Sequence, residues 1–333
     1  MTSSQDTLQH APDRLAPAQA KRLAVVINRD GGTVLRLGAE ALETRLAAAF
    51  GAAGAEAEMH FVPGAEMSAT LERALGRARA GELDGIVVGG GDGSVNGAAN
   101  LLAGTGVPLG VLPLGTLNHF ARDVGMPAEP EAAAQVIASS APRAVDVAEV
   151  NGRVFTNNSL LGAYPYMVAD RERRRDKHGL GKWTAMTLAF LRMLWRFPRR
   201  RLTLVIGGDR RPVRTPALLV GVNAYDPHGF AVRRPALDRG ELFVVLARHS
   251  GPLGFVWFAF RSAFRGLDHA RDFEVHRLHA LEVRAGTSRL PVATDGELLR
   301  LRPPLRFRIR PGELLVLAPA AEDAAAGPNR GGP

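Results

Sequence analysis

Apolar and polar residues alternate in blocks along the first part of the chain, and the blocks predict strands and helices in turn. Short apolar runs of the kind found in buried strands occupy residues 22–28, 57–62, 84–88 and 107–112. Between them, residues 38–50 and 68–80 carry apolar side chains at helical spacing. Strands that alternate with helices form parallel βαβ units, with helices on both faces of the sheet. The pattern therefore predicts an α/β domain.

The pattern changes after residue 141. Short runs with the composition of β-strands follow at residues 143–150, 154–158, 201–206, 217–222, 242–247, 278–284 and 305–310. Turn residues separate these runs at close spacing, which is typical of an antiparallel sandwich or a barrel-like domain. Two helices are predicted to interrupt the runs, near residues 183–196 and 253–264. The second half is therefore expected to be mostly antiparallel β-structure.

Length and composition agree with two folded domains and polar ends. The chain has 333 residues, and a domain commonly holds about 100–200 residues. We expect a disordered leader at 1–20, an α/β domain at 21–140, a β-sandwich domain at 141–320 and a disordered tail at 321–333. Zero cysteines exclude disulfides, thiolate zinc sites and thiol nucleophiles. Because no apolar run is long enough to span a membrane and no secretory signal is visible, a cytoplasmic location is expected.

Positive charge is concentrated in one segment. The chain carries a net charge of +9, and residues 171–201 alone hold eleven basic and two acidic side chains. Within this segment, residues 183–197 have an apolar body with a tryptophan near each end, which suits a helix that lies on an anionic membrane surface. A solvated helix packed on the sandwich would explain the same pattern. Nucleic-acid binding is disfavoured because no nucleic-acid motif accompanies the basic stretch.

The strongest local motif is the sequence GGGDGSVN at residues 89–96, directly after an apolar strand. Glycines allow positive φ and let a ligand approach the backbone N–H groups closely. A helix is predicted to begin at about Ser94, and its positive N-terminal end favours phosphate. Asp92 would lie beside the phosphates, where a carboxylate can bind magnesium or water. A tight turn without a ligand is the competing interpretation.

Two common phosphate-binding motifs do not fit this loop. A Walker loop needs Gly-Lys-Ser or Gly-Lys-Thr after the glycines, and the chain has neither there. A dinucleotide fingerprint follows the first strand, and an acidic residue follows it about 20 positions later. This loop follows the third predicted strand, and no Asp or Glu stands between Gly93 and Arg122. The remaining interpretation is a site that binds a nucleotide through its phosphates.

A second glycine turn, PLGTLNHFAR at residues 113–122, follows the fourth predicted strand. In a parallel sheet, the loops at the carboxyl ends of neighbouring strands converge on one crevice, so Gly93 and Gly115 are expected to face the same ligand. Thr116 or Asn118 can cap the next helix and reach a phosphate or a base. For Thr116 taken alone, capping is the simpler interpretation.

Residues 89–96 and 113–127 together resemble the diacylglycerol kinase catalytic-domain family, which includes bacterial lipid kinases and is related to sphingosine and ceramide kinases. The resemblance is close over 22–127 and traceable to residue 317. It implies a Rossmann-like α/β nucleotide domain of the NAD-kinase and diacylglycerol-kinase type, followed by a β-sandwich domain, with the site in the cleft between them. It also implies ATP-dependent phosphoryl transfer to a lipid hydroxyl, with Mg²⁺ as cofactor.

The resemblance also assigns roles to individual residues. Those implied to bind the nucleotide are Asn28, Gly89, Gly90, Gly91, Asp92, Gly93, Ser94, Val95, Asn96, Gly115, Thr116 and Asn118. The family's third motif is matched by Asp295-Gly296-Glu297, and it implies that Glu297 takes the proton of the acceptor hydroxyl while Asp295 supports it or binds metal. From the residues alone, 292–301 is a β-hairpin with an Asp-Gly turn, and such a turn can also present both carboxylates.

Several positions depart from the family pattern, and two of these departures concern the glycine-rich motif and a candidate metal site. Ser94 stands where threonine is usual, a change that keeps the hydroxyl. Residues 237–242 resemble a strand entry that holds a structural magnesium in some bacterial members, but Arg239 takes the place of the key acid and leaves Asp238. Asp92 and Asp238 are therefore the candidate metal ligands, and the structural magnesium at Asp238 is disfavoured.

The sequence thus predicts a cytoplasmic, peripherally membrane-associated lipid kinase whose acceptor is a lipid such as diacylglycerol or a sphingoid base. A soluble NAD-kinase-like enzyme remains an alternative because it shares the Gly-Gly-Asp-Gly loop. A non-catalytic nucleotide- or lipid-binding regulator is a second alternative, and the presence of Asp92, Asp295 and Glu297 together argues against it. The sequence leaves open which lipid is used and whether the chain forms a homodimer.

Overall fold

The computed structural model describes residues 20–162, 165, 200–225, 234, 236–247 and 273–320. The predicted leader up to residue 19, the tail at 321–333 and the two helices predicted in the second half lie outside the described residues. The basic segment also lies outside them, except for Arg200 and Arg201. In the part that is described, no helix is long and apolar enough to cross a membrane.

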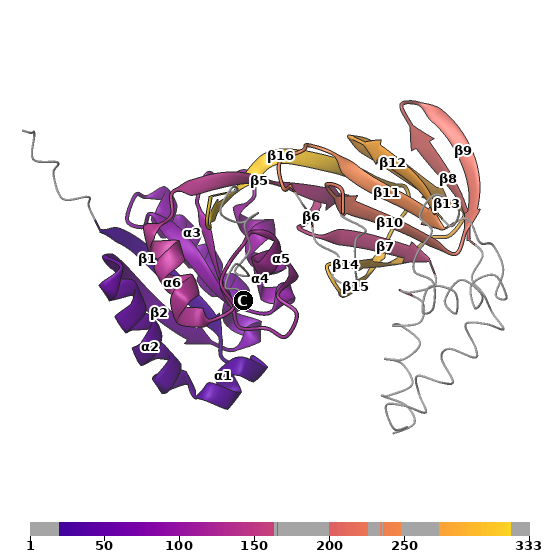
Figure 1. Ribbon diagram of the computed structural model, residues 1–333. Helices are drawn as coiled ribbons and strands as arrows, with labels where there is room; N and C mark the ends of the chain where they lie inside the picture. Colours follow the sequence, from indigo (N-terminus) through magenta and orange to yellow (C-terminus); the bar gives the residue numbers. More distant parts are fainter. Residues whose placement is uncertain are drawn as a thin grey trace, which may run out of the picture.

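The first part of the chain forms a parallel sheet flanked by helices (Figure 1). Its strands, in spatial order, are β2 (Ala55–Val62), β1 (Lys21–Asn28), β3 (Gly85–Gly90) and β4 (Leu109–Pro113). Its helices are α1 (Gly32–Leu37), α2 (Ala39–Ala52), the 3-10 helix η1 (Gly64–Glu66), α3 (Met67–Arg79), α4 (Asp92–Leu102), α5 (His119–Asp123) and α6 (Pro130–Ser139). Strands β1 and β3 are apolar almost throughout because both faces of this sheet are covered.

The order of the strands creates a crevice at one edge of this sheet. The chain moves outward from β1 to β2 and then crosses back to β3, so right-handed crossovers place α2 and α3 on opposite faces. The direction of winding therefore reverses between β1 and β3, which are adjacent. Loops that follow such a pair of strands separate and leave a crevice at the carboxyl ends of the strands. The glycine-rich sequence lies at this edge.

The second part of the described chain forms a β-sandwich. One antiparallel sheet has the order β12 (Phe273–Leu278), β11 (Leu242–Ala247), β10 (Ala217–Val222), β7 (Asn158–Gly162), β14 (Leu290–Thr294) and β15 (Glu297–Leu301). The facing sheet contains β5 (Pro142–Val150), β6 (Arg153–Phe155), β8 (Arg200–Ile206), β9 (Asp209–Thr215), β13 (Ala280–Ala285) and β16 (Leu305–Leu317). Apolar side chains from both sheets share one core, where the rings of Phe155 and Phe307 lie edge to face 6.4 Å apart. The predicted α/β domain with a mostly antiparallel β-sandwich is confirmed.

Strands β5 and β16 join the two parts into one continuous sheet (Figure 1). β5 pairs with β16 along most of its length, and the end of β16 pairs in parallel with β4 through Val316 and Leu317. Leu314, Val316 and Leu317 are buried in the α/β core rather than in the sandwich core. The end of β16 thus packs in the α/β part, whereas the sequence analysis assigned all of 141–320 to the sandwich.

Local irregularities divide two of the predicted strands. The run at 154–158 is broken at Thr156 and Asn157 into β6 and β7, and the run at 278–284 is broken at His279 into β12 and β13. The hairpin predicted at 292–301 is confirmed as β14 and β15. Its turn holds Asp295 at φ 46° and Gly296 at φ 83°, the left-handed pair that a two-residue hairpin with an Asp-Gly turn requires.

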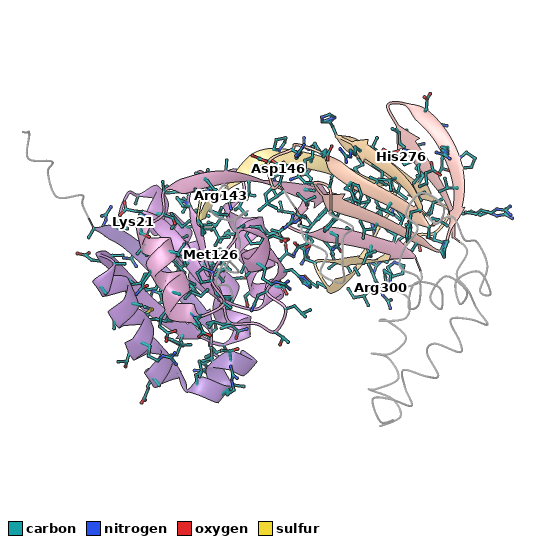
Figure 2. The ribbon with its side chains drawn as sticks, viewed as in Figure 1. Lys21, Met126, Arg143, Asp146, His276 and Arg300 are labelled. Atoms are coloured by element: carbon teal, nitrogen blue, oxygen red, sulfur yellow. The ribbon has the colours of Figure 1, made fainter. Side chains whose placement is uncertain are left out.

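Asp146 is a buried carboxylate on β5, at the joint between the two parts (Figure 2). Its Oδ2 accepts hydrogen bonds from the Gly240 N–H at 2.6 Å and from Asn223 Nδ2 at 3.0 Å, and its Oδ1 accepts one from the Gly312 N–H at 2.8 Å. Gly312 lies where the pairing of β5 with β16 shifts register. The carboxylate therefore satisfies the Gly312 N–H at this irregularity and ties it to Gly240 and Asn223, which lie outside the strands.

We expect Asp146→Ala to lower the free energy of unfolding by about 3 kcal/mol, because it leaves three inward-facing donors without an acceptor. Chemical denaturation followed by circular dichroism measures the change. Asp209→Ala, at the exposed turn of the β8–β9 hairpin, is the matched control and should stay within about 0.5 kcal/mol of the wild type. Equal effects for the two variants would show that the joint does not depend on Asp146.

Candidate active site

The glycine-rich sequence places a helix N-terminus at the crevice. Strand β3 ends at Gly90, and α4 begins at Asp92, two residues earlier than predicted. The Ser94 and Val95 N–H groups bond back to the Gly91 carbonyl. The N–H groups at the start of a helix have no intrahelical acceptor, and they carry the positive end of the helix dipole. This end of α4 can therefore hold an anion such as phosphate.

Close packing, and not left-handed backbone, explains the glycines at positions 89, 90 and 115. None of the glycines at 89–93 has a positive φ, and Gly91 has φ −88°, so the expectation of positive φ is wrong here. A Cβ at Gly90 would lie 2.5 Å from the Ser94 hydroxyl oxygen, and one at Gly115 would lie 2.4 Å from the Gly91 Cα. A Cβ at Gly93 would meet no atom within 4 Å. The two glycine loops thus touch backbone to backbone, and the space beside Gly93 is open.

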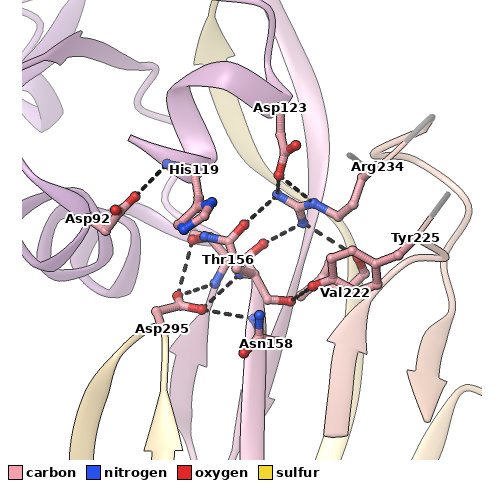
Figure 3. Close-up of polar contacts among 10 residues, drawn as sticks. Asp92, His119, Asp123, Thr156, Asn158, Val222, Tyr225, Arg234 and Asp295 are labelled. Carbon is pink, nitrogen blue, oxygen red and sulfur yellow. Dashed lines mark hydrogen bonds and ion pairs between the residues drawn. The ribbon is translucent and has the colours of Figure 1, made fainter. Parts of the chain in front are cut away.

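Asp92 and Asn118 hold the second loop against the first. Asp92 Oδ1 accepts a hydrogen bond of 2.8 Å from the His119 N–H (Figure 3). Asn118, at φ 49°, accepts from the Gly115 N–H at 2.9 Å and donates to the Gly115 carbonyl at 2.8 Å. The Asn118 side chain thus closes its own loop and makes no cap bond to α5, while Thr116 is exposed.

Asn28 belongs to a third loop at the same edge of the sheet. Its Oδ1 accepts from the Asp30 N–H at 3.0 Å, and Asp30 Oδ2 accepts from the Gly64 N–H at 2.9 Å. A Cβ at Gly64 would lie 3.4 Å from Asn28 Nδ2. The loops after β1 and β2 are therefore tied together beside the crevice. The structure thus brings the predicted nucleotide-binding residues onto loops at the carboxyl ends of β1, β3 and β4.

Asp295 has its carboxylate turned inward from the β14–β15 turn (Figure 3). Oδ1 accepts from the N–H groups of Asn157 and Asn158 at 2.9 and 3.0 Å, and Oδ2 accepts from the Thr156 N–H and hydroxyl at 2.7 and 3.1 Å. Burial raises the pKa of Asp295 above its ordinary value, while these hydrogen bonds act in the opposite direction. Asp295 therefore fixes the break between β6 and β7 to the turn.

Helix α4 connects the two motifs. Asn100 exchanges two hydrogen bonds of 2.8 Å with the backbone of Val154 on β6. With the amide orientation that satisfies its neighbours, the buried Asn96 places Nδ2 3.2 Å from Asp295 Oδ2 and 3.3 Å from the Val154 carbonyl. Asp92 and Asn96 are four residues apart, so they lie on the same face of the helix. The glycine-rich motif and the Asp-Gly-Glu motif are thus brought together.

Glu297 lies on the exposed side of the same turn. Its Oε2 accepts a hydrogen bond of 2.6 Å from Arg153 Nη2, and the two side chains are 53% and 42% exposed. This ion pair connects β15 with β6, next to the place where α4 packs. Glu297 is therefore oriented by the sandwich, and its side chain remains accessible to solvent.

Sequence analysis did not identify the ion pair between Arg234 and Asp123. Arg234 is 2% exposed, and its guanidinium lies 2.8 Å from Asp123 Oδ2 at the end of α5. Beside it, the Tyr225 hydroxyl donates to the Asn157 carbonyl at 2.7 Å, and burial raises the pKa of Tyr225 to about 12. In the sequence, Arg234 stands in the run VRRPA and resembles a surface arginine, so no local pattern indicates that it is buried.

The two candidate metal ligands predicted from the sequence, Asp92 and Asp238, lie in different surroundings. Asp238 is exposed, and across the described ranges no group of three His, Asp or Glu side chains could hold a metal ion. Asp92 keeps one carboxylate oxygen that is not bonded to His119, and it is itself the first residue of α4. Of the two positions, only Asp92 adjoins the anion-binding loop.

We expect Gly115→Ala to weaken ATP binding by about tenfold or more, because the methyl group would push the loop away from Gly91. Titration calorimetry measures the affinity. Gly97→Ala is the control, because Gly97 is exposed on α4 and an added Cβ there meets no atom within 4 Å. A folded Gly115→Ala protein with wild-type affinity would contradict the assignment of these loops.

Two family models match the chain. The diacylglycerol kinase catalytic domain matches residues 22–150, and the YegS C-terminal NAD kinase beta sandwich-like domain matches residues 168–318. A diacylglycerol kinase of Mycobacterium tuberculosis (strain CDC 1551 / Oshkosh) is 30% identical over 257 residues, which cover 74% of this chain and 80% of the relative. A Pseudomonas fluorescens protein named "Probable lipid kinase YegS-like" is 29% identical over 248 residues, which cover 70% and 77%.

A solved structure has the same fold. The crystal structure of a diacylglycerol kinase from Bacillus anthracis superposes with a TM-score of 0.65 at 19% identity and covers 91% of this chain and 99% of that one. The two family models span both parts of the structure described above. The chain belongs to the diacylglycerol kinase catalytic-domain family and is a lipid kinase with ATP as its co-substrate.

Proposed function

We propose that this lipid kinase transfers the γ-phosphoryl group of ATP to a hydroxyl of a membrane lipid, such as diacylglycerol or a sphingoid base. The proposal rests on one observation: Asn96, one turn along α4 from Asp92, contacts Asp295 in the turn at 295–297, here named the acceptor turn. The loops at 89–93 and 113–118 are named the nucleotide loops. A phosphate at the start of α4 and a hydroxyl at the acceptor turn would therefore be close together.

The proposed reaction takes place between the nucleotide loops and the acceptor turn. The acceptor oxygen forms a bond to the γ-phosphorus while the bond from that phosphorus to the bridging oxygen of the β-phosphate breaks, and ADP leaves. The hydroxyl proton passes to Glu297. Because Oε2 of Glu297 accepts from Arg153, Oε1 is the oxygen that we assign to take the proton. Arg153 would keep the carboxylate directed at the acceptor.

The other two carboxylates have supporting roles in this proposal. Four donors from the 156–158 segment surround the Asp295 carboxylate, so it holds the acceptor turn in place and is not assigned to metal. Asp92 Oδ2 is available for a magnesium ion that accompanies ATP, since Oδ1 is bonded to His119. Such an ion would offset negative charge on the phosphates.

The acceptor is identified by incubating the protein with γ-labelled ATP, Mg²⁺ and vesicles that contain either diacylglycerol or sphingosine. NAD in solution serves as the acceptor of the alternative, NAD-kinase-like enzyme. We expect label in a phospholipid product, and its identity names the lipid. Label in NADP and none in lipid would instead support the soluble alternative.

We expect Glu297→Gln to lower the turnover of lipid phosphorylation by about 10²–10⁴-fold, because the amide cannot take the acceptor proton. The dissociation constant for ATP should stay within about threefold, since the nucleotide loops lie in the other part of the molecule. Glu282→Gln, which removes another carboxylate with arginine partners on the sandwich, is the control and should keep wild-type turnover. Wild-type turnover in Glu297→Gln would remove Glu297 from the role of base.

Peripheral membrane binding through the basic segment 171–201 is part of the proposal. Each basic residue near an anionic surface contributes about 1 kcal/mol, and this contribution fades as salt rises. The triple change of Arg199, Arg200 and Arg201 to glutamate should therefore weaken sedimentation with phosphatidylserine vesicles. The same charge change at the exposed Arg36, Arg73 and Arg79 of the α/β part should have little effect. An equal loss of vesicle binding in both variants would indicate that binding depends on the net charge of the protein and not on this segment.

A further inference from the structure

Arg234 is a buried charge, and each nitrogen of its guanidinium donates a hydrogen bond. It donates four hydrogen bonds: Nε to Asp123 Oδ2 at 2.8 Å, Nη2 to Asn157 Oδ1 at 2.9 Å, and Nη1 to the carbonyls of Thr156 at 2.5 Å and Val222 at 3.4 Å. Nη2 also lies 2.8 Å from Asp123 Oδ2 in an ion pair. A guanidinium presents its donors in a rigid planar fork, so these contacts fix the positions of its partners as well as its own. Arg234 therefore acts as a rigid connector.

The partners of Arg234 come from different parts of the molecule (Figure 3). Asp123 is the last residue of α5 in the α/β part, whereas Thr156, Asn157 and Val222 belong to the sandwich. A buried ion pair gives little net stability over apolar side chains of similar size, because both charges lose their hydration. The Arg234–Asp123 ion pair is therefore better explained by its effect on geometry, because it fixes two elements from different parts of the molecule relative to each other.

The first element, α5, begins at the nucleotide loops. Its first residue, His119, donates its N–H to Asp92, and the preceding residue, Asn118, closes the loop around Gly115. Its last residue, Asp123, is held by Arg234. With five residues, α5 spans about 7.5 Å. A single short helix thus connects the loop that meets the nucleotide with the guanidinium.

The second element, the break between β6 and β7, supports the acceptor turn. Arg234 binds the Thr156 carbonyl and the Asn157 side chain, while Asp295 binds the N–H groups of the same segment. The segment is thus held between a cation on one side and a carboxylate on the other. Glu297 follows Asp295 by two residues, so its position depends on this arrangement.

We propose that Arg234 is a positioning residue that couples the nucleotide loops to the acceptor turn through α5 and the 156–158 segment. The role in turnover rests on the lipid kinase function proposed above, whereas the mechanical coupling does not. Loss of Arg234 would leave the nucleotide loops formed and would let the acceptor turn shift relative to them. A displacement of about 1 Å at a reacting group can lower turnover by about 100-fold.

Hydrogen exchange tests the coupling without any lipid. In Arg234→Met, the amides of 156–158 should exchange at least about tenfold faster than in the wild type, while those of β3 keep their rate. Arg77→Met, which removes an exposed ion pair with Glu58, is the control and should alter neither region. If exchange at 156–158 is unchanged, or if every region accelerates equally, Arg234 does not hold this segment specifically.

Kinetics then separate positioning from stability. Arg234→Met should lower kcat by about 10–100-fold and leave the dissociation constant for ATP within about threefold. Arg234→Lys keeps the charge but lacks the planar fork, so it should restore kcat only in part. The double variant Asp123→Leu/Arg234→Met removes both charges, so its melting temperature should return toward that of the wild type while its kcat stays low.

Two outcomes would overturn the proposal: a wild-type kcat in folded Arg234→Met, or recovery of kcat together with stability in the double variant. A wild type that phosphorylates no lipid would count against the proposed function alone, because the exchange experiment still decides whether Arg234 holds the 156–158 segment.

Discussion

The break between β6 and β7 imposes the constraint on which the candidate site depends. At this break the backbone of 156–158 leaves one sheet and enters the other at the junction of the two parts, and its N–H groups bond to the Asp295 carboxylate instead of to a neighbouring strand. Buried peptide groups must be hydrogen-bonded, because an unpaired one costs about as much as a lost hydrogen bond. Asp295 accepts from the N–H groups and Arg234 donates to a carbonyl of the same segment. The position of the 295–297 turn follows from this pairing.

The bonds of Asp295 and Arg234 to the 156–158 segment also determine how the two substrates of the proposed reaction are aligned. Phosphoryl transfer requires mainly that donor and acceptor be aligned and that developing charge be stabilised. Helix α4 provides both features, since its N-terminus favours phosphate and Asn96, one turn further on, contacts Asp295. The continuous strands β5 and β16 resist separation of the two parts. The site is therefore built on elements that belong to both parts.

Much of this arrangement could be predicted from the sequence. The parallel sheet followed from apolar runs that alternate with helices, and the Asp-Gly turn followed from its residues. The sequence identified the glycine loop, but the reason given for it was incomplete: Gly90 and Gly115 are needed for close approach to Ser94 and Gly91, and no glycine at 89–93 has left-handed backbone. Local sequence could not place the end of β16 beside β4, since strand pairing over such separations leaves no periodic signal. It could not reveal Arg234 either, because burial of an arginine depends on partners more than 70 residues away.

The central claim is that the N-terminus of α4 and the 295–297 turn form one site. The most direct measurement is a crystal structure of the protein with Mg²⁺ and a non-hydrolysable ATP analogue. We expect the terminal phosphate to bind at the start of α4 beside Gly93, on the side from which Glu297 can reach an acceptor. A nucleotide bound elsewhere, or a terminal phosphate directed away from Glu297, would contradict it.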